Sequence, residues 1–74
     1  MDVCSTIGTN IRKLRNSRKL SQEELAFNAG IDRSYLSEIE NGHKNLSVVV
    51  LDQIASALGV KIMQLFTGYK GAER

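Results

Sequence analysis

Three helix starts in this chain share one arrangement of residues, and this arrangement limits the possible folds more than any other feature of the sequence. In each, an apolar residue precedes a polar residue that can cap a helix, and a second apolar residue follows five positions after the first. The three sets are Leu20, Ser21 and Leu25; Ile31, Asp32 and Leu36; and Leu46, Ser47 and Leu51. Glu24 also completes a capping box with Ser21. The pattern predicts helices that begin near residues 22, 33 and 48.

The rest of the chain also follows a helical period. Ile7, Ile11 and Leu14 share one face of a first helix, and Ile62, Leu65 and Phe66 suggest a short fifth one. Glycines are expected to end the second, third, fourth and fifth helices, at Gly30, Gly42, Gly59 and Gly68. We therefore predict an all-α, compact five-helix domain that comprises residues 1–74, with its core at about residues 6–67.

The composition fits one small domain and excludes several classes of function. The chain has 74 residues, 42% of them apolar, and its charges are well mixed. Cys4 is the single cysteine, and the chain has neither a signal-peptide pattern nor an apolar run of about 20 residues. We therefore expect a cytoplasmic protein with no membrane association. One histidine, His43, and no glycine-rich phosphate loop predict no metal site, no cofactor and no enzymatic activity.

The charges are unevenly distributed along the sequence. The net charge is +2, which is weak evidence for a polyanionic partner. Residues 10–20 contain five basic residues and no acidic one, whereas residues 21–42 contain five acidic residues and one basic residue, Arg33. A basic surface for nucleic acid and an ordinary solvated surface both agree with this distribution.

The second and third predicted helices are separated by about three residues, "AGI". So short a turn makes the two helices cross steeply, which requires a small residue at Ala26 and a residue that tolerates positive φ at Gly30. The space between the helices would be filled by Leu25, Ile31, Leu36 and Ile39. This is a helix-turn-helix arrangement, whose second helix protrudes far enough to enter a major groove. Such units also occur as packing modules that bind no DNA.

The segments "IRKLRNSRKLSQEELAFNAGIDRSYLSEIENG" and "LDQIASALGV" resemble the phage-repressor (Cro/Xre-type) helix-turn-helix family, with its lambda-repressor-like fold. The resemblance covers roughly residues 7–66. Within the family, the length, "DRSYLSEIE" and "KNLS" are most similar to controller proteins of restriction-modification systems. Two positions depart from the family pattern: Leu46 stands where proline is frequent, and Lys61 where a Ser or Thr cap is frequent.

The resemblance implies a sequence-specific DNA-binding transcription regulator that binds a pseudo-palindromic operator in double-stranded DNA as a homodimer, with RNA polymerase as a further candidate partner. A phage or mobile-element repressor is the nearest alternative. An antitoxin or another protein-interaction module with no primary DNA role is the alternative from a different class. Salt-dependent binding to duplex DNA would separate these classes.

Helical geometry gives each acidic residue of the third helix a different role. With Leu36 and Ile39 at the buried centre, Glu40 lies beside the buried stripe, as Arg15 does on the first helix. We predict an ion pair between Glu40 and Arg15, which the family resemblance also implies; two independent surface charges are the alternative. Asp32 is expected to cap the third helix with its carboxylate.

The remaining polar residues around the third helix are candidate DNA contacts. Glu38 faces outward, where it would accept from a cytosine amino group, weaken indiscriminate binding, or remain solvated. Tyr35 lies on a flank, where packing on the second helix is the alternative to DNA contact. The candidates for base contact are Arg33, Ser34, Ser37 and Glu38, and those for backbone contact are Gln22, Tyr35, Asn41, Lys44 and Asn45.

The C-terminal third carries apolar residues outside the predicted core. They are Val49, Met63, Phe66 and Tyr69. We predict that they form the dimer interface, because one short helix contacts too few base pairs for useful specificity. Scattered surface apolar residues are the alternative.

Overall fold

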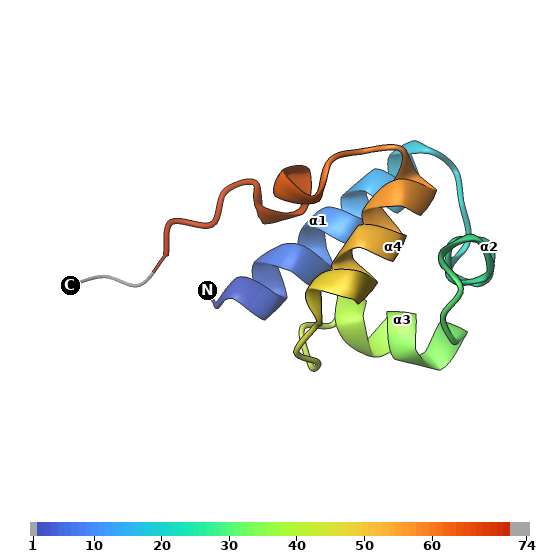
Figure 1. The fold of residues 1–74 in the computed structure, drawn as a ribbon, viewed down its shortest axis with the longest axis horizontal. Coiled ribbons are helices and arrows are strands. Elements are labelled where there is room, and N and C mark those ends of the chain that lie inside the picture. Colours follow the sequence, from blue (N-terminus) through green and yellow to red (C-terminus); the bar gives the residue numbers. More distant parts are fainter. Residues whose placement is uncertain (1, 72–74) are drawn as a thin grey trace.

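The structure, a computed structural model, describes residues 2–71 of the chain. It contains four α-helices and one 3₁₀ helix, and no strand occurs within these residues. The helices are α1 (Val3–Ser17), α2 (Gln22–Ala29), α3 (Arg33–Glu40) and α4 (Val48–Leu58), followed by the 3₁₀ helix η1 (Ile62–Phe66) (Figure 1). The all-helical prediction is confirmed, and the prediction of five helices is correct only if the 3₁₀ turn is counted.

Two of the three expected side-chain caps are present. Ser21 Oγ accepts from the Glu24 N–H at 3.0 Å, and Glu24 Oε1 accepts from the Ser21 N–H at 2.8 Å, which completes the capping box of α2. Ser47 Oγ accepts from the Val50 N–H at 3.1 Å at the start of α4.

The prediction that the Asp32 carboxylate caps α3 is wrong, although Asp32 does occupy the N-cap position. Asp32 occupies the position before α3 with an extended backbone, but its side chain makes no capping hydrogen bond. Asp32 and the first-turn residues Arg33 and Ser34 are exposed. The free N–H groups of this turn are therefore accessible to water and do not need a side-chain acceptor.

The last element is a 3₁₀ helix of five residues, and its first residue follows a position that has no side-chain cap for an α-helix. Lys61 offers no acceptor for a cap, as its sequence position suggested. Instead, Gln64 Oε1 accepts from the Lys61 N–H at 2.9 Å, and the Gln64 N–H bonds the Lys61 carbonyl at 2.9 Å. These short-range bonds tighten the backbone into i to i+3 geometry.

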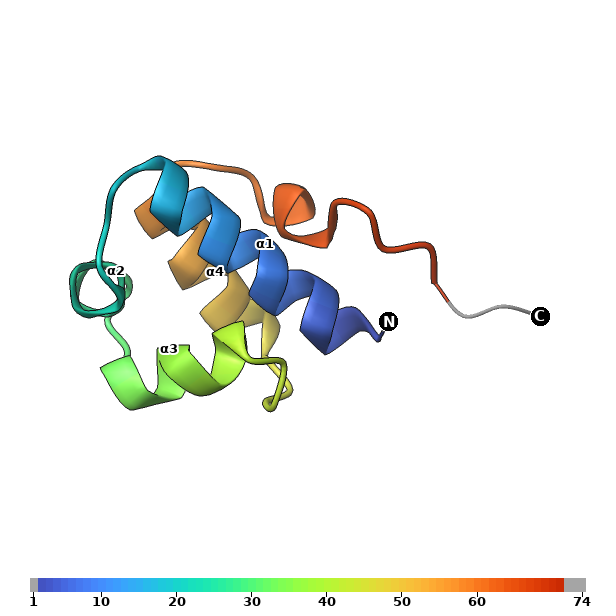
Figure 2. The ribbon, with the colours of Figure 1, turned by 180° about the vertical axis from the view of Figure 1, so that it is seen from behind.

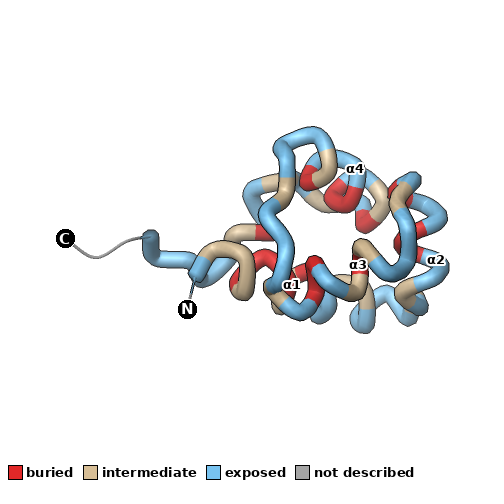
Figure 3. The backbone as a smooth tube through the Cα atoms, turned by 90° about the horizontal axis from the view of Figure 1, so that it is seen from below, coloured by how far each residue is buried: buried red, intermediate tan, exposed pale blue. Residues whose placement is uncertain are grey.

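The helices enclose one apolar core. α3 packs against α1 and α2, α2 also packs against α4, and η1 lies against α1 and α4 (Figure 2). Buried positions lie on the inner sides of the helices, and exposed positions on the outer sides (Figure 3). The buried apolar residues are Ile7, Ile11, Leu25, Ala26, Ala29, Leu36, Ile39, Leu51, Ile54, Ala55, Leu58 and Leu65. None of the helices described is long and apolar enough to cross a membrane.

Two glycines fix the geometry that the site needs. Gly30 ends α2 with φ of 75°, in the left-handed region that side-chain-bearing residues avoid. Gly8 lies inside α1 where this helix crosses α3, and a Cβ there would overlap the Ile39 carbonyl oxygen and lie 2.8 Å from that of Glu40. The absence of a side chain at Gly8 therefore brings α1 directly onto the C-terminal end of α3.

Candidate nucleic-acid interface

The helix-turn-helix unit presents one side of α3 to solvent. Leu36 and Ile39 are buried, whereas Ser34, Glu38 and Asn41 on the opposite side are exposed. Ser37, which was expected on the same side, is half-buried. Tyr35 is half-buried and packs against the core, in agreement with the packing alternative for its ring. The outward surface is therefore short, polar and centred on a few side chains.

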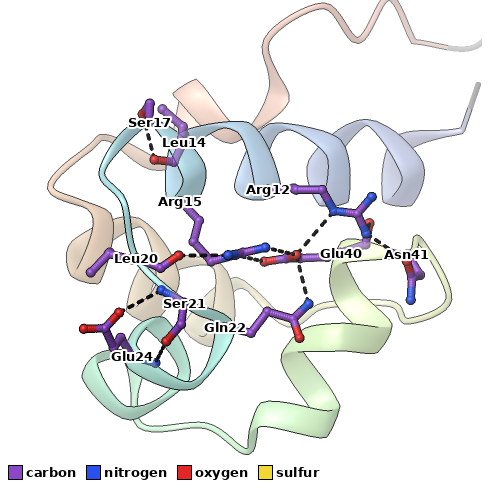
Figure 4. Close-up of polar contacts among 10 residues, drawn as sticks. All are labelled: Arg12, Leu14, Arg15, Ser17, Leu20, Ser21, Gln22, Glu24, Glu40 and Asn41. Carbon is purple, nitrogen blue, oxygen red and sulfur yellow. Dashed lines mark hydrogen bonds and ion pairs between the residues drawn. The ribbon is translucent and has the colours of Figure 1, made fainter.

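A buried carboxylate holds α3 against α1. Glu40 is 3% exposed, and Arg15 donates to it twice, from Nε to Oε2 at 2.7 Å and from Nη2 to Oε1 at 3.1 Å (Figure 4). Arg15 Nη1 also donates to the Leu20 carbonyl at 2.8 Å. The ion pair predicted from the positions of Arg15 and Glu40 beside the buried stripes of their helices is present in the structure. Its bidentate geometry is the strong form of an Arg–carboxylate contact.

Two further residues join this pair and extend it toward the outward surface. Gln22 Nε2 donates to Glu40 Oε1 at 3.1 Å, so the start of α2 is bound to the end of α3. Arg12 lies 3.4 Å from the same oxygen, and its Nη2 donates to Asn41 Oδ1 at 2.8 Å (Figure 4). Two candidate backbone contacts, Gln22 and Asn41, are therefore held in place by one network centred on the buried Glu40 carboxylate.

The sequence interpretation missed Arg12. Its spacing contained the signal, because Arg12 precedes Arg15 by three residues and so lies on the same side of α1. Arg12 remains about half exposed, with a side-chain exposure of 46%, so its guanidinium is accessible to a partner as well as to Glu40.

The network keeps Glu40 ionised. Burial by itself raises the pKa of Glu40, because the charged form loses hydration. The hydrogen bonds from Arg15, Gln22 and Arg12 and the charge of Arg15 lower it, and together they prevail, so the pKa of Glu40 lies below its ordinary value.

Arg33 is the basic residue of α3, at its first turn. It lines an open groove of about 520 Å³ together with Arg15, Ser21, Gln22 and Glu23. Arg33 is exposed, and in residues 2–71 no hydrogen bond or ion pair engages its side chain. Its guanidinium is therefore free to meet a ligand in front of α3.

The loop after α3 carries the other candidate contacts. Lys44 Nζ lies 3.8 Å from Glu38 Oε1, so the outward acid of α3 has a basic neighbour that the sequence interpretation did not pair with it. Asn45 Oδ1 accepts from Cys4 Sγ at 3.2 Å, which ties this loop to α1. His43 is exposed, and within residues 2–71 its one hydrogen bond runs from its backbone N–H to the Glu38 carbonyl.

The apolar residues proposed for a dimer interface differ in exposure. Val49 and Met63 are 68% and 80% exposed, and Tyr69 is 38% exposed, whereas Phe66 is half-buried against the core. Sequence periodicity did not single out two other exposed apolar residues, Phe27 at 84% and Val48 at 71%. Within the described part of the chain, no group of three or more His, Cys, Asp or Glu residues is placed to hold a metal ion.

A tight turn, a supporting second helix and an exposed polar face on the third helix define this molecule as a helix-turn-helix protein of the kind that places a helix in the major groove. Comparison with known proteins agrees. A helix-turn-helix family model matches residues 11–65. The chain belongs to the Cro/Xre-type helix-turn-helix family of DNA-binding transcription regulators, which are not enzymes.

Several relatives are restriction-modification control proteins. Control protein C.MunI from a Mycoplasma species is 40% identical over 67 residues, which are 89% of this chain and 90% of that protein. The controller protein C.AhdI from Aeromonas hydrophila has a crystal structure with a TM-score of 0.83 and 41% identity, covering 85% of this chain and 96% of that one. The immunity repressor of Bacillus phage phi105 is 42% identical over 57 residues, 77% of this chain but 40% of the repressor.

Proposed function

We propose that this protein controls transcription of a restriction-modification system by binding a pseudo-palindromic operator as a homodimer. The observation that carries the proposal is the exposed face of α3, which is held by the Glu40 network and flanked at both ends by polar side chains. The size and similarity of the controller relatives support the specific system, because they match nearly the whole of both chains.

In this proposal, the residues around α3 divide their roles. Arg33 enters the groove first and donates to guanine O6 and N7, while Ser34, Ser37 and Glu38 face the neighbouring base edges. Gln22, Asn41, Lys44 and Asn45 contact phosphates on either side and set the register of the helix. Tyr35, which packs against the core, offers only its exposed edge to the backbone.

A second copy of the chain would supply the other half of the recognition. Two α3 helices related by a two-fold axis would contact two half-sites about one helical turn apart, roughly 34 Å. Val49, Met63 and Tyr69, with an edge of Phe66, offer the apolar surface for that contact. RNA polymerase remains a candidate partner for a dimer that activates transcription.

Selection of DNA from a random-sequence duplex pool, followed by footprinting, tests the proposal. The expected result is one enriched pseudo-palindrome, protected on both half-sites, with binding that weakens steeply as salt rises. Binding without sequence preference would contradict it, and the absence of any DNA binding would favour a protein-interaction module.

A phage repressor is the second candidate, because the phi105 immunity repressor matches this chain at 42% identity over a part of its length. The genes that flank this one distinguish the two. A methyltransferase and an endonuclease gene are expected for a controller, and phage genes for a repressor.

A further inference from the structure

We propose that Glu38 is a specificity-determining residue that acts through Lys44, holding this lysine back from DNA that is not the operator. The inference rests on the proposed function, because it concerns how the same surface distinguishes an operator from other DNA. In this proposal, Lys44 binds a phosphate at low free-energy cost only when Glu38 gains a donor from a base.

The contact that carries the proposal joins two candidate DNA ligands of opposite charge. Lys44 Nζ lies 3.8 Å from Glu38 Oε1, and the two side chains are 45% and 52% exposed. The backbone keeps them together, since the His43 N–H bonds the Glu38 carbonyl at 3.0 Å immediately before Lys44. The pair is therefore built at the end of α3, on the surface that faces DNA.

The other charged groups of α3 do not share this arrangement. Glu40 is buried and bonded by Arg15, Arg12 and Gln22, so its charge is already compensated. Arg33, at the opposite end of α3, has no partner among the residues described. The proposed interface thus contains two kinds of basic residue: Arg33, which has no ionic partner among the residues described, and Lys44, which is paired with Glu38.

The pair has different consequences on the two kinds of DNA. Any duplex offers phosphates to Lys44, but binding one requires Lys44 to leave Glu38, whose carboxylate then stands unpaired near the same backbone. An operator with a suitably placed cytosine also offers an N4 amino group, from which Glu38 accepts a hydrogen bond. On the operator, the hydrogen bond from cytosine to Glu38 therefore offsets the loss of the Lys44–Glu38 contact. On other DNA, nothing offsets that loss.

The expected effect is modest for each protomer and larger for a dimer. An exposed ion pair corresponds to about two- to five-fold in an equilibrium constant. If both protomers contact DNA, the factors multiply to about four- to twenty-five-fold. The penalty should appear mainly in binding to unrelated DNA, where the phosphates alone provide the affinity.

A double-mutant cycle tests the proposal. Glu38→Gln removes the charge and keeps an acceptor oxygen, so it should increase the affinity for a scrambled duplex by about four- to twenty-five-fold and the affinity for the selected operator by less. The salt dependence of scrambled-duplex binding should steepen, because Lys44 then displaces counterions freely. In a Lys44→Gln background, the gain from Glu38→Gln should be smaller and match that of the Asp52→Asn control, because only the general repulsion between carboxylate and phosphates is then relieved.

Asp52→Asn is the matched control, since Asp52 is exposed on α4 and the substitution changes the net charge equally. Anisotropy titrations of all variants, with oligomeric state checked by sedimentation, give the comparison. If Glu38→Gln and Asp52→Asn raise scrambled-duplex affinity alike in the presence of Lys44, or if the effect of Glu38→Gln is undiminished without Lys44, the inference is wrong while the proposed function stands. If the wild-type protein does not prefer the operator, both are overturned.

Discussion

Glu40 is the residue on which three helices converge. Its carboxylate accepts from Arg15 and Arg12 of α1 and from Gln22 of α2, and it lies at the last position of α3. A buried charge of this kind is tolerable only because the donors replace its lost hydration. The same donors set the position of α3 relative to the start of α2, so the residue affects both stability and the shape of the proposed DNA-contacting face.

Glu40→Gln should lower the free energy of unfolding by about 3–5 kcal/mol, because it leaves the Arg15 guanidinium with a neutral partner in a buried site. Arg15 is 13% exposed at its side chain, which favours the lower end of this range. Urea denaturation measures the change. Glu38→Gln, an exposed change of the same kind on the same helix, serves as control and should alter stability by less than about 0.5 kcal/mol. Equal stabilities of the two variants would contradict the prediction.

The stability that Glu40 provides should disappear in acid. Because its pKa in the folded state lies below the ordinary value of 4.5, its contribution is fully present above that pH and is lost as pH falls through the folded pKa. Urea denaturation from neutral pH to about pH 3 should therefore show the difference between wild type and Glu40→Gln shrinking below pH 4.5. A difference that stays constant through this range would argue against an ionised Glu40.

Alanine substitutions of Arg33 and Lys44 should affect DNA binding in different ways. Arg33→Ala should cost about 1–3 kcal/mol per half-site and relax the preference at one base pair, because the lost fork matches guanine. Lys44→Ala should weaken operator binding without relaxing the preference that Arg33 sets, and flatten the salt dependence of operator binding by about one unit. Unrelated DNA should lose less affinity, because Glu38 already holds Lys44 back there. The measurement is binding to operators substituted one base pair at a time. A uniform loss for Arg33→Ala would make Arg33 a backbone contact.

At the scale of the elements, the crossing of α1 and α3 determines whether the network can form. Gly8 lies against the Ile39 and Glu40 carbonyl groups, so the two helix backbones are close enough for Arg12 and Arg15 to reach Glu40. Alanine is ordinarily favoured over glycine inside a helix by about 1 kcal/mol. Here the neighbouring atoms are backbone, which cannot rotate out of the way.

Gly8→Ala should therefore destabilise the protein by about 1–3 kcal/mol in spite of the better helix propensity. It should also weaken operator binding, because the end of α3 must move away from α1. Thermal melts and operator titrations measure the two effects. Ser56→Ala, at an exposed position of α4, is the control and should leave both nearly unchanged. A stabilised Gly8→Ala variant would show that the crossing has room for a methyl group.

At the scale of the whole molecule, the exposed apolar side chains outside the core are expected to contact a second copy of the chain. A domain of this size contacts few base pairs with one short helix, and two copies on related half-sites double the contacts. Val49, Met63 and Tyr69 leave apolar surface in solvent that association would remove. Dimerisation would thus serve both specificity and the stability of a small core.

Met63→Lys should shift the protein toward monomer and weaken operator binding several-fold or more, since a charge would be buried in the apolar contact. Sedimentation at tens of micromolar, with and without operator DNA, measures the association. Phe27→Lys is a matched control, because Phe27 is also highly exposed but lies on α2, outside the proposed interface. If wild type sediments as a monomer in both conditions, the proposed dimer is wrong.

The sequence by itself determined the helices and the buried face of each, because caps, glycines and the 3.6-residue period act over a few neighbouring residues. Ser21 and Ser47 begin helices as predicted, and Gly30 ends α2 in the left-handed conformation. The sequence also placed Arg15 and Glu40 at the edges of their apolar faces, from which their pairing followed.

Only the tertiary structure decided which residues from different elements meet. Gln22 reaches Glu40, and Asn45 meets Cys4, across separations in sequence that no local pattern links. Local reasoning assigned Asp32 a capping bond that an exposed first turn does not need. It also treated Glu38 and Lys44 as separate ligands, although the turn after α3 brings their side chains within 3.8 Å. Such contacts depend on how helices cross and loops fold back, and those geometries are set by the packing of the whole core.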